Sequence, residues 1–224
     1  MDLIVRYGKR FGLGLLLLTV VDLALLAARL VITGSSRYSF IPWNLALAWL
    51  SLLLAGFLVS ELRRRRWLSW QNLILTVGWV VLLPNTWYVL TDLVHVFPNG
   101  EISQLYDIVL IFLMVLTAFV MGFAGLFLIH RELLGRVSLA KSWLFIEAVV
   151  LISSFAIYLG RDLRWNSWDV ITNPGGVLVN VSDKIVDPLG NPRALNVTLL
   201  FFVLINAIYG AFWLFSQPPK KGRH

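Results

Sequence analysis

The sequence predicts an all-α integral membrane protein, a polytopic bundle of about six transmembrane helices. Of its 224 residues, 58% are hydrophobic and only 14% are charged, whereas a soluble domain is about half apolar and a quarter charged. The apolar residues also form long blocks, each close to the roughly 20 residues that a helix needs to cross the hydrocarbon core. Lipid cannot satisfy open backbone groups, and the alternating pattern of a membrane barrel is absent, so helices are predicted.

Six apolar blocks follow one another with mostly short connections. The first comes after basic residues, as in a signal peptide, but its apolar run is too long for one and no clean cleavage motif follows. Since spans and short loops use almost every residue, we expect a single integral membrane domain over residues 1–224. The predicted spans are Phe11–Ile32, Ile41–Ser60, Trp70–Leu90, Leu105–His130, Trp143–Gly160 and Ala194–Phe215.

The only long connection runs from Arg161 to Arg193. Within it, Asn173 and Pro174 are typical of a helix N-cap followed by the first helical residue. Apolar residues then recur every four positions, at Val177, Val181 and Ile185. This spacing predicts a short helix on the membrane surface, although valines at alternate positions would also fit a strand.

The basic residues indicate the orientation. The segment before the first span and those after the second, fourth and sixth hold 13 Lys and Arg, against 5 in the other loops. Cytoplasmic segments collect Lys and Arg. We therefore expect a multi-pass protein of the bacterial inner membrane, with both termini cytoplasmic. The net charge of +7 is explained by these flanks, so the lipid bilayer is the expected partner and nucleic acid is not.

The chain contains no cysteine. Disulfides, thiolate metal sites and cysteine nucleophiles are therefore excluded. Any chemistry must come from other polar side chains, and these gather in three segments, Phe40–Asn44, Leu83–His95 and Gly160–Asp169. The predicted topology places all three at the outer ends of spans. We expect them to converge on one outward-facing pocket.

Two of these segments carry distinctive patterns, PN-x-W-Y-x-L-T-D-L-x-H and R-W-N-S-W-D. With them the chain, from about Phe40 to Phe215, resembles a family of bacterial multi-spanning membrane proteins catalogued as a domain of unknown function. The resemblance implies an integral membrane protein. It implies no activity and no catalytic residues, so these must be inferred from the side chains.

Four acidic or imidazole side chains are the catalytic candidates: Asp92, His95, Asp107 and Asp169. Asp92 and His95 are three residues apart and share one face if the third span stays helical beyond Pro84. With Asp107 they could bind a divalent metal ion that activates water. In the structural alternative, Asp107 interacts with the positive end of the fourth span, and the other two form hydrogen bonds to nearby loops.

Arg161, Arg164, Trp165 and Asn166 are the candidates for binding a phosphate or lipid headgroup. Guanidinium groups bind phosphate in a fork geometry. The alternative is that these residues anchor the end of the span, because Trp and Arg are common at membrane interfaces. The density of hydrogen-bonding groups in this segment favours binding.

Within the spans, Pro84 predicts a kink or, alternatively, a break that opens backbone groups to a cavity. Asp22, Arg29 and Glu147 are the notable intramembrane charges. Arg29 is expected to extend its head group to the outer interface. Asp22 lies near mid-span. It either has a functional role or forms a hydrogen bond that helps to pack the helices.

Three functions fit these features. The first is an enzyme, a metal-assisted hydrolase or transferase acting on a lipid-linked, phosphate-bearing or other envelope substrate. The second is a small transporter or channel, with Asp22 and Glu147 along its path. The third is a non-catalytic membrane assembly subunit. The clustering of polar segments on one membrane face favours the first.

Overall fold

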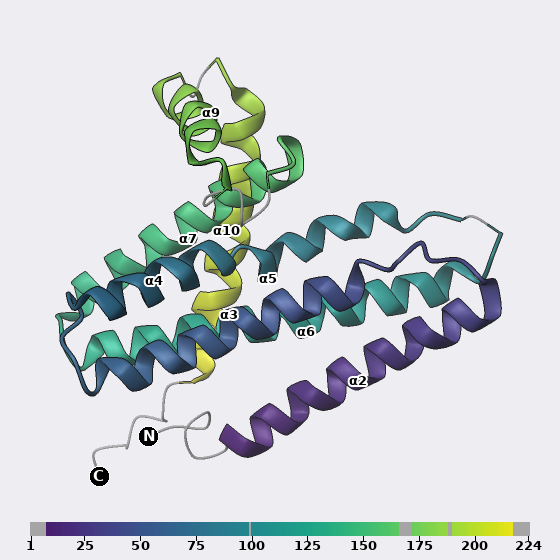
Figure 1. The fold of residues 1–224 in the computed structure, drawn as a ribbon, viewed down its shortest axis with the longest axis horizontal. Coiled ribbons are helices and arrows are strands. Elements are labelled where there is room, and N and C mark those ends of the chain that lie inside the picture. The colour runs from purple at the N-terminus through teal and green to yellow at the C-terminus, as the bar shows by residue number, and fades with distance from the viewer. Residues whose placement is uncertain (1–7, 99, 166–171, 188–189, 217–224) are drawn as a thin grey trace, which may run out of the picture.

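The computed structural model describes residues 8–98, 100–165, 172–187 and 190–216. This part of the chain is helical and contains no strand, which confirms the all-α prediction (Figure 1). The elements are α2 (Gly8–Thr33), α3 (Ile41–Leu62), α4 (Trp70–Leu82), α5 (Asn85–Tyr88), the 3-10 helix η1 (Val89–His95), α6 (Gln104–Leu134), α7 (Leu139–Asp162), α9 (Pro174–Val186) and α10 (Pro192–Phe215).

Six helices of the described chain are long and apolar enough to cross a membrane, counting Trp70–His95 as one span. This confirms the predicted spans, and the third extends beyond its predicted end at Leu90. Large apolar side chains cover the outside of the bundle, where a soluble protein would carry polar ones. Leu13, Leu17, Leu53, Phe112 and Leu200 are each more than half exposed. The bundle therefore suits a lipid bilayer.

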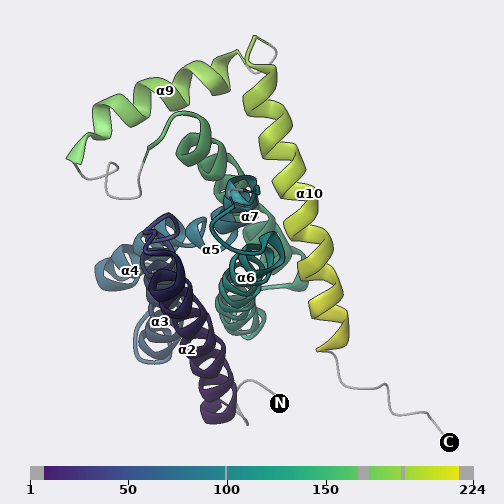
Figure 2. The ribbon, with the colours of Figure 1, turned by 90° about the vertical axis from the view of Figure 1, so that its right-hand side faces the viewer.

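The helix α6 lies at the centre of the bundle (Figure 2). It contacts α2, α3, α5, η1 and α7. An aromatic-rich core, which includes Trp79, Trp87 and Phe123, joins α6 to α4, α5, α7 and α10. A second, aliphatic core joins α6 to α2 and α3.

The interruption after α4 follows from Pro84, which has no backbone N–H to donate to the preceding turn. Two neighbouring side chains bond the carbonyls at this point. Asn85 Nδ2 donates to the Leu82 carbonyl at 3.0 Å, and Thr86 Oγ1 donates to the Leu83 carbonyl at 2.7 Å. The chain continues as α5 and then as η1 up to His95.

A glycine of α6 lets the interrupted span pack closely. A Cβ at Gly122 would lie 2.8 Å from the Thr86 Cβ and 2.9 Å from the Trp87 Nε1. Real Cβ atoms do not approach neighbours this closely, so a larger residue would push α5 away from α6. Gly122 thereby sets the position of the segment that leads into η1.

The predicted short helix in the longest connection is confirmed as α9. The Asn173 Oδ1 accepts a hydrogen bond from the Gly176 N–H at 3.1 Å, which is the predicted N-cap. Figure 2 shows α9 outside the bundle, between the end of α7 and the start of α10.

The connections alternate between the two ends of the bundle. Those from α3 to α4 and from α6 to α7 lie at one end, at the left of Figure 1. Those from α2 to α3 and from η1 to α6 lie at the other end, at the right. The polar segment that begins at Phe40 and the one that ends at His95 therefore lie at the same end of the bundle.

Candidate functional site

The 3-10 geometry of η1 aligns two rows of side chains. In a 3-10 helix, residues three apart are eclipsed. One row contains Asp92 and His95, and the other continues from Tyr88 of α5 through Thr91 to Val94. Both rows line one cavity. The interruption at Pro84 and the tighter winding that follows thus determine which side chains face this cavity.

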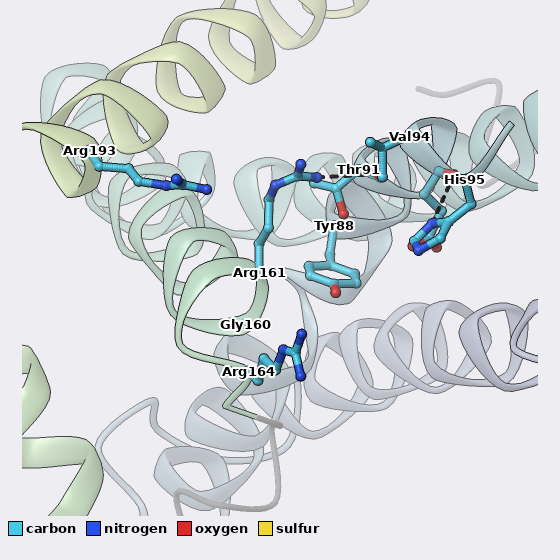
Figure 3. Close-up of a pocket in the computed structure, with 9 residues that line it drawn as sticks. Tyr88, Thr91, Val94, His95, Gly160, Arg161, Arg164 and Arg193 are labelled. Atoms are coloured by element: carbon cyan, nitrogen blue, oxygen red, sulfur yellow. Dashed lines mark hydrogen bonds and ion pairs between the residues drawn. The ribbon is translucent and has the colours of Figure 1, made fainter. Parts of the chain in front are cut away.

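We call this the η1–α7 cavity; its volume is about 450 Å³. Its walls come from α5 and η1, from the end of α7 and from the start of α10. Figure 3 shows Arg161 and Arg164 on the α7 side and His95 on the η1 side. The lining residues are Tyr88, Thr91, Asp92, Val94, His95, Gly160, Arg161, Arg164 and Arg193.

Two of the three polar segments line this cavity, and the first contacts its wall through Asp92. From the first, Asn44 Nδ2 donates to Asp92 Oδ2 at 2.8 Å. From the third, Arg161 Nη1 donates to the Thr91 carbonyl at 3.3 Å. The amide of Asn44 holds one oxygen of Asp92 and leaves the other, Oδ1, on the side of His95.

His95 and Asp92 form a loose pair within the cavity wall. His95 Nδ1 lies 4.0 Å from Asp92 Oδ1 and 3.3 Å from the Asp92 backbone carbonyl. The His95 side chain is 54% exposed, whereas that of Asp92 is 8% exposed. Arg37 fixes the end of η1 by donating to the His95 carbonyl at 2.8 Å. The imidazole is thus open to a ligand, with a buried carboxyl behind it.

Arg161 lies in the last turn of α7, and Arg164 lies in an unusual turn just after it. Arg164 has a left-handed φ of +58°, a conformation that favours glycine at helix ends. This turn lets the Trp165 N–H donate to the Leu159 carbonyl at 3.2 Å. A Cβ at Gly160 would lie 3.4 Å from both the Trp165 carbonyl oxygen and the Tyr88 ring, so the small residue permits close packing here.

The third arginine of the cavity comes from α10. Arg193 forms an ion pair with Asp162 and so joins the start of α10 to the end of α7. Its charge is partly balanced by this carboxylate. Arg161 and Arg164 form no ion pair with any described carboxylate in the structure. Both guanidinium groups line the cavity.

Asp107 lies in a separate network and does not line the cavity. Arg29 Nε donates to Asp107 Oδ1 at 2.7 Å, and Arg29 Nη2 contacts Asp107 Oδ2 at 3.3 Å and Glu101 Oε2 at 2.8 Å. Arg29 is fully buried, and its head group points to the end of α2, where it reaches Glu101 in the loop before α6. The bidentate pairing with Asp107 satisfies the guanidinium inside the protein.

Tyr38 joins this network to the cavity wall. Its hydroxyl lies 3.1 Å from Asp107 Oδ2, to which it donates, and 3.4 Å from the His95 carbonyl. Burial, followed by the hydrogen bond to Asp107, raises the pKa of Tyr38 above its ordinary value. The hydroxyl therefore keeps its proton and remains a donor.

The predicted metal-binding set of Asp92, His95 and Asp107 is not assembled. Among the described residues, no group of three or more His, Asp or Glu side chains is placed to hold a metal ion. The pairing of Asp107 with Arg29 accounts for this separation. Asp169 and Asn166, the other two predicted site residues, lie outside the described residues.

Of the predicted phosphate-binding residues, Arg161 and Arg164 line the cavity and Trp165 does not. The Trp165 ring lies near the start of α9, where a Cβ at Gly176 would be 2.9 Å from it. Sequence reasoning assigned no role to Arg193. Its position beside Pro192, at the start of the last span, was the signal that it shares one end of the bundle with Arg161.

Comparison with known proteins gives one family. The profile described as "Protein of unknown function (DUF1361)" matches residues 43–208. The matched region includes every residue that lines the cavity, whereas α2 and Tyr38 precede it. No curated protein and no solved structure matches the chain. Since the match covers more than half of its length, the chain belongs to the DUF1361 family.

Proposed function

We propose that the η1–α7 cavity binds a phosphate-bearing substrate, and that His95 assists its hydrolysis or group transfer as an acid–base group. The observation that carries the proposal is that one cavity is lined by Arg161, Arg164 and the Asp92–His95 pair. Convergence of cationic and acid–base groups in one concave site is a general mark of a functional site.

The charges of the cavity favour an anion. Arg161 and Arg164 each present a planar guanidinium group, which donates two parallel hydrogen bonds to a phosphate. Arg161 is oriented by the Thr91 carbonyl, and Arg164 is held by the turn at the end of α7. Two such groups on one wall can bind the oxygens of a single phosphate.

The opposite wall supplies the acid–base group. The exposed imidazole of His95 can take a proton from an attacking water or hydroxyl, or give one to the leaving oxygen. Asp92 Oδ1, 4.0 Å from His95 Nδ1, stabilises the imidazolium that forms. Asn44 keeps Asp92 in this position through the hydrogen bond to Oδ2.

The proposal places the cavity on the extracytoplasmic side. The basic run Arg63–Arg66 follows α3 at the opposite end of the bundle, and Lys and Arg are enriched in cytoplasmic loops. Both termini would then be cytoplasmic. The substrate would be a phosphate-bearing molecule of the outer leaflet or the envelope.

Binding of inorganic phosphate and of phosphatidic acid to the purified full-length chain tests the binding step. Arg161→Gln and Arg164→Gln should each weaken binding about fivefold, because an exposed charged contact is worth about 1 kcal/mol. Arg63→Gln removes the same charge at the other end and should leave binding unchanged. Equal losses in all three variants would show a non-specific charge effect and contradict the proposal.

The catalytic step is tested separately with His95→Gln. This variant keeps the arginines, so phosphate binding should persist while release of inorganic phosphate from phosphatidic acid is lost. General acid–base catalysis contributes about 10²–10⁴-fold, so the loss should fall in that range. Undiminished turnover in the variant would remove His95 from the mechanism.

A further inference from the structure

Asp22 is a fully buried acid in the middle of α2. It lies eleven residues before Thr33, or roughly 16 Å from that end of the helix at 1.5 Å per residue. Neither of its carboxyl oxygens has a hydrogen-bond partner among the described residues. This combination of complete burial and missing partners distinguishes it from Asp107, which is equally buried but bonded to Arg29.

Two contacts on the same face of α2 show what surrounds Asp22. Three residues earlier, Thr19 Oγ1 accepts a hydrogen bond from Trp49 Nε1 of α3 at 3.1 Å. Seven residues later, Arg29 pairs with Asp107 of α6. Because residues three and seven apart lie on one helical face, Asp22 is directed at α3 and α6. At this level the three helices form the aliphatic core that includes Leu45, Ala48, Leu110 and Met114.

No cation of the packed helices lies at the level of Asp22. The nearest on α2 is Arg29, about 10 Å along the axis, and it already binds the carboxylates of Asp107 and Glu101. The other titratable groups lie near the helix ends: Lys9 and Arg10 on α2, Glu61 on α3, and Tyr106, Asp107, His130, Arg131 and Glu132 on α6.

We propose that Asp22 is a proton-binding group, held as the neutral carboxylic acid within the core between α2, α3 and α6. An ionised carboxylate without a partner is strongly disfavoured in an apolar interior, whereas the protonated acid is tolerated there. Loss of the proton would leave an uncompensated charge. Deprotonation must therefore accompany a movement of α2 that admits water or a counter-charge. The inference does not depend on the η1–α7 cavity.

The test is labelling of the full-length chain in lipid vesicles with dicyclohexylcarbodiimide, an apolar reagent that reacts with protonated carboxyl groups. At pH 7, an ordinary aspartate in water is protonated in only about one molecule in a thousand. Peptide mass spectrometry should find the adduct on Asp22 and not on Asp107, which serves as a charged, buried control in the same molecule. We expect at least about a tenfold excess of adduct on Asp22, because Arg29 binds both oxygens of Asp107 and those of Asp22 have no described partner.

Peptide mapping of the wild-type protein identifies the labelled residue, so the test does not depend on the folding of a variant. As a control, Asp22→Asn should abolish the adduct. An unlabelled Asp22, or labelling of Asp22 and Asp107 to the same extent, overturns the proposal. Protection of Asp22 by sodium ions at constant pH also overturns it, because the carboxylate would then be binding a metal cation in place of a proton. Protection by rising pH alone supports it.

Discussion

Removing Arg29 should be among the most damaging single changes in the bundle. The guanidinium is buried and forms two contacts with Asp107, at 2.7 and 3.3 Å, and one with Glu101 at 2.8 Å. In Arg29→Met, Asp107 keeps only the Tyr38 hydroxyl as a partner among these residues. Breaking one side of a buried ion pair costs about 3–5 kcal/mol. Since Asp107 is also buried, solvent does not reduce this cost.

The double variant Arg29→Met with Asp107→Leu separates two causes of instability, the unpaired charge of Asp107 and the altered packing of the side chains. Replacing both partners by apolar groups is often nearly neutral, because no uncompensated charge remains. The Tyr38 hydroxyl then loses Asp107, but the His95 carbonyl, 3.4 Å away, can accept in its place. The double variant should therefore be much closer to the wild type than Arg29→Met is.

Thermal unfolding in detergent micelles measures both variants. For a chain of this size, 1 kcal/mol corresponds to about 2–4 °C, so Arg29→Met should lower the melting temperature by about 6–20 °C. The double variant should recover most of that loss. A double variant that is as unstable as Arg29→Met, or less stable, would refute the view that the unpaired Asp107 charge causes the damage.

Three further predictions concern the approach to the cavity. Gly122→Ala should destabilise the bundle by about 1–3 kcal/mol in the same assay, because the new Cβ collides with Thr86; an unchanged melting temperature would contradict this. Arg164→Gly should be about 1 kcal/mol more stable than Arg164→Gln, since glycine relieves the left-handed backbone, yet both should bind phosphate equally poorly. Asn44→Leu should lower turnover with little effect on phosphate affinity, because it frees Asp92 without touching the arginines; a loss of affinity alone would indicate a different role.

Much of the fold follows from the sequence because membrane helices obey a simple constraint. Backbone groups cannot remain unsatisfied in lipid, so long apolar blocks identify spans directly. The N-cap at Asn173 was also readable, since capping depends on local residue types. The contacts of η1 with Asn44 and with Arg161 could be expected from topology, because all three polar segments lie at one end of the bundle.

The site could be predicted only in part. Which side chains of different helices meet depends on how each helix is rotated about its axis and on the level of each residue along the bundle. Asp107 and His95 lie at the same end of the bundle, yet Asp107 faces α2 and pairs with Arg29. Nothing in the residue types distinguishes that pairing from a shared metal site. The alignment of Tyr88 with Thr91 and Val94 was equally hidden, because it depends on the change from α-helical to 3-10 winding after Pro84.

Solid-state NMR can test directly whether phosphate binds between η1 and α7. Dipolar couplings between ³¹P of bound phosphate and ¹⁵N of labelled arginine report which guanidinium groups contact the anion. We predict couplings that disappear in the Arg161→Lys, Arg164→Lys double variant and persist when Arg63 and Arg64 are replaced by Lys. Couplings that persist in the first double variant and disappear in the second would contradict the account, because the phosphate would then lie at the opposite end of the bundle.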